Sequence, residues 1–181
     1  QLLANAVVRV KSVDIRGTRL TTDQVTTLCR AIIEEGENVK KLETLDMSFV
    51  DLSHVDSQLL ANAVVRVKSV NICPNILTTD QVNTLCRTII EEEESVKKLE
   101  SLNMCGVDLR DVDSQLLANA VVRVKSVSVN RFKSVNRDTG LTTDQVNTLF
   151  RTIIEKEERV KKLETLNMNG VYLSHVDSQV L

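Results

Sequence analysis

The chain has 181 residues, 42% of them hydrophobic and 27% charged, proportions typical of a globular domain large enough to bury a core. Its formal net charge of −2 argues against a nucleic-acid partner, because binding a phosphate backbone requires a basic surface. No apolar run approaches the ~20 residues that a membrane-spanning helix needs, so we expect no membrane partner.

One stretch, QLLANAVVRVKSV, occurs three times, at residues 1–13, 58–70 and 115–127. The copies divide the chain into units 1–57, 58–114 and 115–178, and the third carries seven additional residues near 130–140. Such repetition predicts a single solenoid domain in which each unit buries its apolar face against the next. Because neither end carries a polar capping repeat, we expect a fragment of a longer array.

Each unit contains two short strand motifs, V-x-x-V-x-I and L-x-x-L-x-M. The motifs start at Val10, Leu42, Val67, Leu99, Val124 and Leu163. This spacing predicts six parallel strands, with motif positions one, four and six facing the core and positions three, five and seven facing outward. Since helical patterns separate the strands, the expected fold class is α/β, with the strands on the concave side and the helices on the convex side.

The longer helix of each unit is predicted from TTDQVTTLCRAIIEE and its two relatives. The apolar residues that share one face of the first copy are Val25, Leu28, Cys29, Ile32 and Ile33. A Thr followed three residues later by Gln predicts a capping box at Thr21, Thr78 and Thr142. The shorter helix lies in VDSQLLANAVVRV, where Asp56 or Ser57 can cap it.

The strand motif resembles the leucine-rich repeat, L-x-x-L-x-L-x-x-N-x-L, over nearly the whole chain. Two alternating repeat types that total 57 residues are most similar to the ribonuclease-inhibitor class, which also supplies the sensor domains of intracellular innate-immunity receptors. The resemblance implies a curved right-handed solenoid. Among the residues at the Asn position of the consensus, only Asn75 keeps Asn, so the turns after the other strands are expected to be looser or differently bonded. The residues that replace it are Thr18, Val50, Val107 and Val171.

The units differ most at the outward positions of their strands, whereas their helices barely differ. A partner-binding surface varies in this way, although neutral drift at exposed positions gives the same pattern. The candidate partner-binding residues at motif positions five, seven and eight are Asp14, Arg16, Asp46, Ser48, Phe49, Asn71, Cys73, Asn103, Cys105, Ser128, Asn130, Arg131, Asn167 and Asn169. Position two alternates Lys with Glu and position three holds only Ser or Thr, which predicts two ladders across the sheet.

The seven-residue insertion lies in SVNRFKSVNRDTGL, after the fifth strand. It places Phe132 beside Arg131, and aromatic and Arg side chains are frequent anchors of protein interfaces. The echo of KSVN inside the insertion indicates instead a local duplication without function, and both interpretations stay open.

The cysteines fall into two pairs. Cys29 and Cys86 share one helix position, which Phe150 fills in the third unit, so we expect them in the core. Cys73 and Cys105 share position seven of neighbouring strands, where they can form a strained disulfide or stay free. We expect free thiols, because the lack of any Asn-x-Ser/Thr acceptor favours a reducing, cytoplasmic environment.

No pattern in the sequence indicates catalysis. A nucleophile elbow, a phosphate loop and a paired-carboxylate motif are all missing from the sequence. His54 and His175 lie in loops without neighbouring ligands, so no metal or other cofactor is expected. The preferred hypothesis is a non-enzymatic scaffold that binds another protein through its concave sheet and rim loops, with the ligand-sensing part of a larger intracellular receptor as a special case. The alternative is an assembly module whose uncapped ends stack head to tail as a homo-oligomer.

Overall fold

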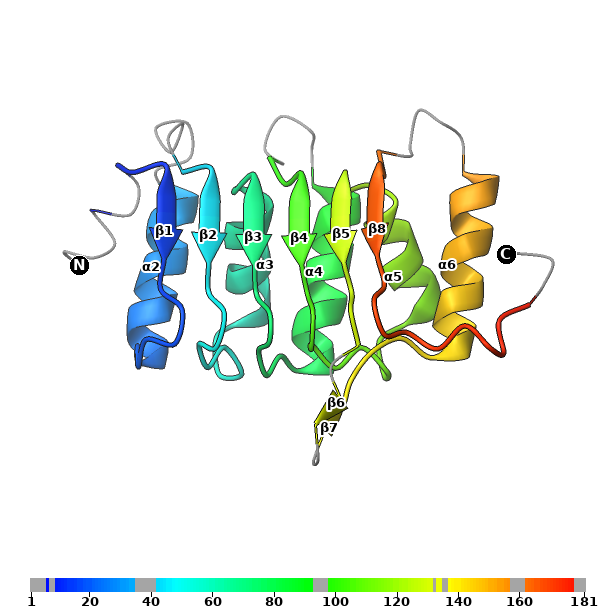
Figure 1. The fold of residues 1–181 in the computed structure, drawn as a ribbon. Coiled ribbons are helices and arrows are strands. Elements are labelled where there is room, and N and C mark those ends of the chain that lie inside the picture. The colour runs from blue at the N-terminus through cyan, green and yellow to red at the C-terminus, as the bar shows by residue number, and fades with distance from the viewer. Residues whose placement is uncertain are drawn as a thin grey trace.

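The computed structural model describes residues 6, 9–34, 42–92, 98–131, 133–134, 137–156 and 162–177, and within them strands and helices alternate along the chain (Figure 1). The strands of the main sheet are β1 (Ser12–Asp14), β2 (Thr44–Asp46), β3 (Ser69–Asn71), β4 (Ser101–Asn103), β5 (Ser126–Ser128) and β8 (Thr165–Asn167). The helices are α2 (Thr22–Glu34), α3 (Ser57–Val65), α4 (Thr79–Glu91), α5 (Ser114–Val121) and α6 (Thr143–Glu155).

The main sheet has six parallel strands in the order β1-β2-β3-β4-β5-β8. Its register pairs equal motif positions, so that Val13 lies beside Leu45, and Leu45 beside Val70. This arrangement confirms the expected α/β class and the six parallel strands. Each of these strands is three residues long and covers motif positions three to five. In β1 the middle residue, Val13, is buried, and its two neighbours, Ser12 and Asp14, point outward.

Two residues depart from the expected inward and outward positions. Val10, expected in the core, is 43% exposed, because it precedes the first strand at the edge of the sheet, and Ser48, expected on the surface, is 3% exposed, because its hydroxyl turns back to Asp46.

The described helices all lie against one face of the main sheet (Figure 1). We call the other face, which carries motif positions three, five and seven, the open face. The two layers arise because every helix has one apolar side, which can be buried only against the sheet and the neighbouring helices. The open face therefore remains accessible along the whole row of strands.

The helix starts follow the predicted capping signals. Thr78 Oγ1 accepts a hydrogen bond from the main-chain N–H of Gln81, whose side chain accepts one from Thr78 N–H in return, at 3.1 and 2.9 Å. The same reciprocal pair forms at Thr21 and at Thr142. Of the two candidate caps of the shorter helix, Asp56 is the one that accepts from the helix, at Leu59 N–H.

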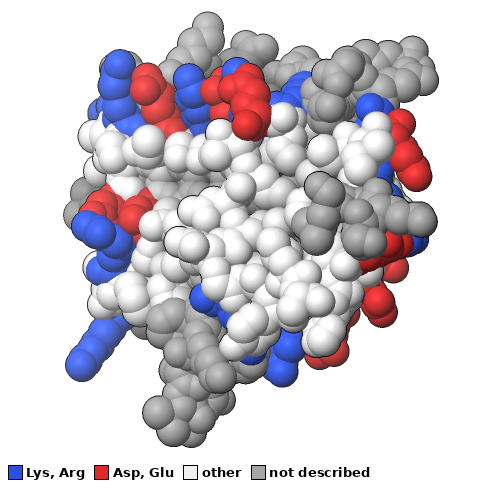
Figure 2. Space-filling view, turned by 45° about the vertical axis from the view of Figure 1, so that its right-hand side comes forward, with Lys and Arg blue, Asp and Glu red and all other residues white. Residues whose placement is uncertain are grey.

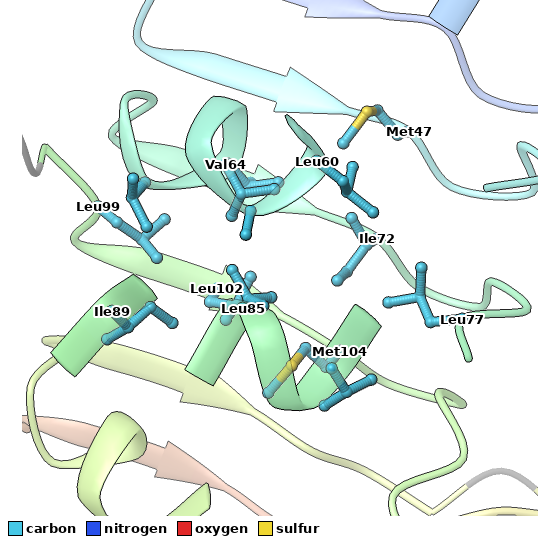
Figure 3. Close-up of a cluster of buried hydrophobic side chains, with 14 of the residues drawn as sticks. Met47, Leu60, Val64, Ile72, Leu77, Leu85, Ile89, Leu99, Leu102 and Met104 are labelled. Carbon is cyan, nitrogen blue, oxygen red and sulfur yellow. The ribbon is translucent and has the colours of Figure 1, made fainter. Parts of the chain in front are cut away.

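The core forms where the inward strand residues meet the apolar side of the helices. Figure 3 shows Leu102 and Met104 of the β4 motif among Leu85 and Ile89 of α4. The predicted stripe of α2 is buried at Val25, Leu28, Cys29 and Ile32, whereas Ile33 is only partly buried. Burying side chains of this size contributes roughly 1.5–3 kcal/mol each, which makes the core the main source of stability.

Buried glutamines connect successive repeats. The Nε2 of Gln81 donates to the carbonyl oxygens of Leu52 and Val55, both at 2.7 Å, and Gln81 is 2% exposed. Gln145 repeats the arrangement one unit later, with bonds to Leu109 and Val112. A single Gln thus closes the start of its own helix and satisfies two carbonyls of the preceding turn, which fixes the spacing of neighbouring repeats.

The predicted ladder of alternating charges runs across the sheet, whereas of the position-three hydroxyls that the structure describes only those of Thr44 and Ser12 share a hydrogen bond, at 2.6 Å. Lys125 and Lys68 pair with Glu100 at 3.5 and 3.6 Å, and Lys11 pairs with Glu43 at 3.3 Å. Figure 2 shows basic and acidic side chains gathered in a row along the top of the molecule, above a broad uncharged surface. Exposed pairs of this kind contribute only about 0.2–1 kcal/mol each, so they mainly select the register.

The insertion of the third unit forms a small antiparallel hairpin of β6 (Lys133–Ser134) and β7 (Arg137–Asp138). It projects beyond the C-terminal ends of the main strands (Figure 1). Among the described residues, no helix has the length and apolarity needed to cross a membrane.

Candidate functional site

The open face brings most of the predicted partner-binding residues together. The register places the position-five residues side by side, with Asp46 next to Asp14 and Asn71 next to Asn103. Ser128 and Asn167 continue this row on β5 and β8. The result is one continuous polar strip across all six strands.

Most of the position-five side chains also perform a local structural task. Asn71 and Asn103 each accept the main-chain N–H two residues later, from Cys73 and Cys105, at 3.1 Å. Asp14, Asp46 and Asn167 make the same bond at 3.0, 2.9 and 3.2 Å. A short Asx side chain that captures this N–H turns the chain out of the strand. In the sequence, this turn is indicated by the recurrence of Asp or Asn at motif position five, a pattern that on its own is equally typical of a binding surface.

The strip carries its charges at one end. Arg16 Nη2 lies 2.7 Å from Asp14 Oδ2, and its Nε lies 3.7 Å from Asp46 Oδ2. Asp46 also accepts from Asn71 Nδ2 at 3.0 Å, which joins the charged pair to the neutral part of the strip. The hydrogen bond from Arg16 lowers the pKa of Asp14, so this carboxylate stays ionised at neutral pH.

The middle of the strip holds two thiols. Cys73 and Cys105 are half-buried and free, and Cys105 Sγ lies 3.1 Å from Ser128 Oγ. Burial raises the pKa of Cys73, and together with the charge and the hydrogen bond of the neighbouring Cys105 it brings this pKa to about 12. Cys73 therefore stays protonated at neutral pH and does not supply the thiolate that a nucleophilic cysteine requires.

The turns after the strands differ from the consensus in the way the missing Asn residues predict. Thr18 and Val50 donate their N–H to Ile15 and Met47, three residues earlier, and Val107 and Val171 make the equivalent bond. This turn needs a left-handed residue at position eight, which is supplied by Gly17, Gly106 and Gly170. At β2 the same place is taken by Phe49, with φ of 58° and 67% of its surface exposed.

The turn after β5 is organised around Arg131. Its guanidinium carbon lies 3.9 Å from the ring centre of Tyr172, a cation–π contact between the turns that follow β5 and β8. Gly140 packs against the same Arg, since a Cβ there would come within 3.1 Å of Arg131 Cγ. Tyr172 is the only Tyr of the chain, but no motif in the sequence pairs it with Arg131. The predicted anchor Phe132 lies outside the described residues.

The remaining predicted site residues lie on the same rim. Ser48 donates its hydroxyl to Asp46, and Asn130 accepts the N–H of Asn169 at 2.8 Å. His54 and His175 are exposed in loops. Among the described side chains, no three His, Cys, Asp or Glu residues converge on a point that could hold a metal ion.

Comparison with known proteins adds no assignment, since neither a protein-family model nor a curated protein matches this chain.

Proposed function

We propose that the chain belongs to a leucine-rich-repeat solenoid of the ribonuclease-inhibitor class, curved with its sheet on the concave side. Longer and shorter helices alternate behind an in-register parallel sheet, which supports this class. A second support is Asn75, the one residue that keeps the consensus Asn. Its Nδ2 donates to the carbonyl of Met47 in the preceding repeat at 2.8 Å, which ties successive turns together.

We further propose that the protein is a non-enzymatic scaffold that recognises another protein through the open face and the adjoining rim. The observation that carries this proposal is the contrast between the two layers: the helices repeat almost letter for letter, whereas the uncovered strip changes from unit to unit. A mixed polar surface with an exposed aromatic at its rim, here Phe49, suits a protein interface. A cytoplasmic receptor whose ligand-sensing part has this form is the setting we favour.

The experiment compares two Arg substitutions in the affinity capture of partners. Ser101→Arg places a long side chain in the centre of the open face, and Glu34→Arg places the same side chain on the helix layer. We expect a partner captured by the wild type to be lost with Ser101→Arg and kept with Glu34→Arg, while both variants keep the wild-type circular dichroism. Loss of the partner with Glu34→Arg alone would contradict recognition through the open face.

End-to-end assembly is the second candidate, and one observation favours it. Ile154 of α6 is 67% exposed, and Leu166 of β8 is only partly buried although Leu102, its counterpart in β4, is 2% exposed. This side could accept another repeat, from this chain or from a second copy. The expected partners at the other end, Leu2, Leu3 and Val7, lie outside the described residues. Light scattering that gives only monomer at high concentration would exclude assembly of copies.

A further inference from the structure

Two thiols meet in the middle of the open face. Cys73 and Cys105 follow β3 and β4, whose register places equal motif positions side by side. Each Cys donates its main-chain N–H to the Asn two residues earlier, at 3.1 Å, so both leave their strands through the same turn. Both residues are half-buried, and a hydrogen bond joins their side chains. Because neighbouring strands lie ~4.8 Å apart, the two sulfur atoms are within reach of one small ligand.

The main chain is less constrained at this pair than at the neighbouring turns. Gly17 and Gly106 donate their N–H to the position-seven carbonyl of the next strand, at 2.9 and 3.2 Å. Between β3 and β4 the equivalent donor would be Pro74, which has no N–H. The carbonyl of Cys105 therefore does not receive this bond, and the two turns can adjust their separation at the level of the thiols without breaking it.

The surroundings of the pair favour a cation. Burial, the charge of the neighbouring Cys105 and the carboxylate of Asp46 all raise the pKa of Cys73. Asp46 shares Arg16 with Asp14, at 3.7 and 2.7 Å, so two carboxylates and one guanidinium leave this part of the strip with one net negative charge. A cation bound between the sulfur atoms offsets the repulsion that opposes their ionisation.

The number and the kind of ligand atoms select the ion. Soft thiolates favour Cu(I), which is stable with only two such ligands in a line, whereas Zn²⁺ in proteins takes four ligands. Within the part of the chain that the structure describes, no third Cys, His, Asp or Glu joins the pair to complete a larger ligand set. The pair therefore suits a monovalent soft ion.

We propose that Cys73 and Cys105 form a two-coordinate site for Cu(I) on the open face. Each thiol releases its proton to solvent as its sulfur binds, so one Cu⁺ replaces two protons and the complex carries one negative charge. Ser128 Oγ lies 3.1 Å from Cys105 Sγ and can donate its hydroxyl to the bound thiolate. The site needs no protein partner, so it is independent of the recognition proposed for the open face.

The test transfers Cu(I) to the reduced, folded chain from the coloured chelator bicinchoninate, under nitrogen. We expect one equivalent of copper to move to the chain, which the loss of the chelator's colour measures. Cys73→Ser and Cys105→Ser, each shown to be folded by circular dichroism, should bind Cu(I) at least a hundredfold more weakly. The matched control is Cys86→Ala, which removes a core thiol that is 2% exposed and should bind as the wild type does.

Two further measurements identify the ligands. X-ray absorption of the copper-loaded chain should show two sulfur neighbours and no nitrogen or oxygen neighbour, and an excess of Zn²⁺ should leave the copper in place. Copper that stays with the chelator, wild-type affinity in Cys73→Ser, or loss of binding in folded Cys86→Ala would overturn the proposal. So would any other set of copper neighbours, or displacement of the copper by Zn²⁺, because Zn²⁺ requires a larger ligand set.

Discussion

Phe49 adopts the left-handed backbone conformation that Gly106 adopts at the same motif position two strands away, with φ of 58° and 73°. For a residue with a Cβ this conformation costs roughly 1–2 kcal/mol. Phe49 recovers little of that cost by burial, because 67% of its surface is exposed. A strained and exposed aromatic on the rim of the open face is a feature that binding can explain and folding cannot.

Replacing Phe49 with Gly should therefore stabilise the fold. Relief of the left-handed strain exceeds the added flexibility of the unfolded chain, so we expect the free energy of unfolding to rise by about 0.5–1 kcal/mol. The control is Gly17→Ala, at a position where an added Cβ meets no atom within 4 Å. That variant should lose about 1 kcal/mol in urea unfolding. A loss of stability in Phe49→Gly would contradict the strain at this residue.

Replacing Gln81 with Ala should destabilise the fold strongly. The variant leaves the buried carbonyls of Leu52 and Val55 without their donor and removes half of a capping box. We expect a loss of about 2–4 kcal/mol in urea unfolding. Gln24→Ala is the matched control, because Gln24 makes the same capping box but is exposed. Its loss should stay below about 1 kcal/mol, and equal losses in both variants would refute the bridging role of Gln81.

Because two thiols are buried, we expect the free energy of unfolding to fall at alkaline pH. Burial raises the pKa of Cys29 and of Cys86 from 9.0 to about 12, so between these values the unfolded chain releases protons that the folded chain retains. Stability should fall across that window, by about 1.4 kcal/mol per pH unit for each thiol. Cys29→Ala should unfold more easily than the wild type at neutral pH, because it loses packing in the core, but its stability should fall with a shallower alkaline slope. Urea unfolding between pH 8.5 and 10.5 measures this, and an unchanged slope would contradict the assignment.

The hairpin of the third unit should be dispensable for folding. Deleting residues 132–138 joins Arg131 to Thr139 and restores the shorter connection of the second unit. We expect wild-type far-ultraviolet circular dichroism and a similar melting temperature, because loop length has a small effect on stability. If the insertion is a duplication without function, captured partners stay bound to this variant. If Arg131 and Phe132 form an anchor, the partners are lost with the deletion and with the double Ala variant.

The register of the sheet could be predicted because the same residues recur at a constant spacing. Each copy buries its apolar side chains against the same elements, so equal motif positions lie side by side. The large apolar side chains at motif position four, such as Leu45 and Leu102, are stabilised only when they are buried in the core, which fixes the inward face of each strand. The outward residues were harder to interpret, since a polar side chain on a strand can serve the chain itself or a partner. Asn71 and Asn103 serve the chain by ending their strands, which periodicity alone could not reveal.

Other features needed three-dimensional comparison of the units. The left-handed backbone conformation of Phe49 follows from its turn, in which it takes the position that Gly17 and Gly106 occupy after their own strands. The contact of Arg131 with Tyr172 joins residues of two successive strand motifs, which no local pattern connects.

Recognition of a protein through the open face is tested most directly by site-specific photo-crosslinking. A photoreactive phenylalanine analogue is placed at Ser101 on the open face and, in a second variant, at Glu34 on the helix layer. Mass spectrometry then identifies the proteins attached to each. We expect a discrete protein adduct at position 101 that is missing at position 34. The same adducts at both positions, or adducts at position 34 alone, would contradict it.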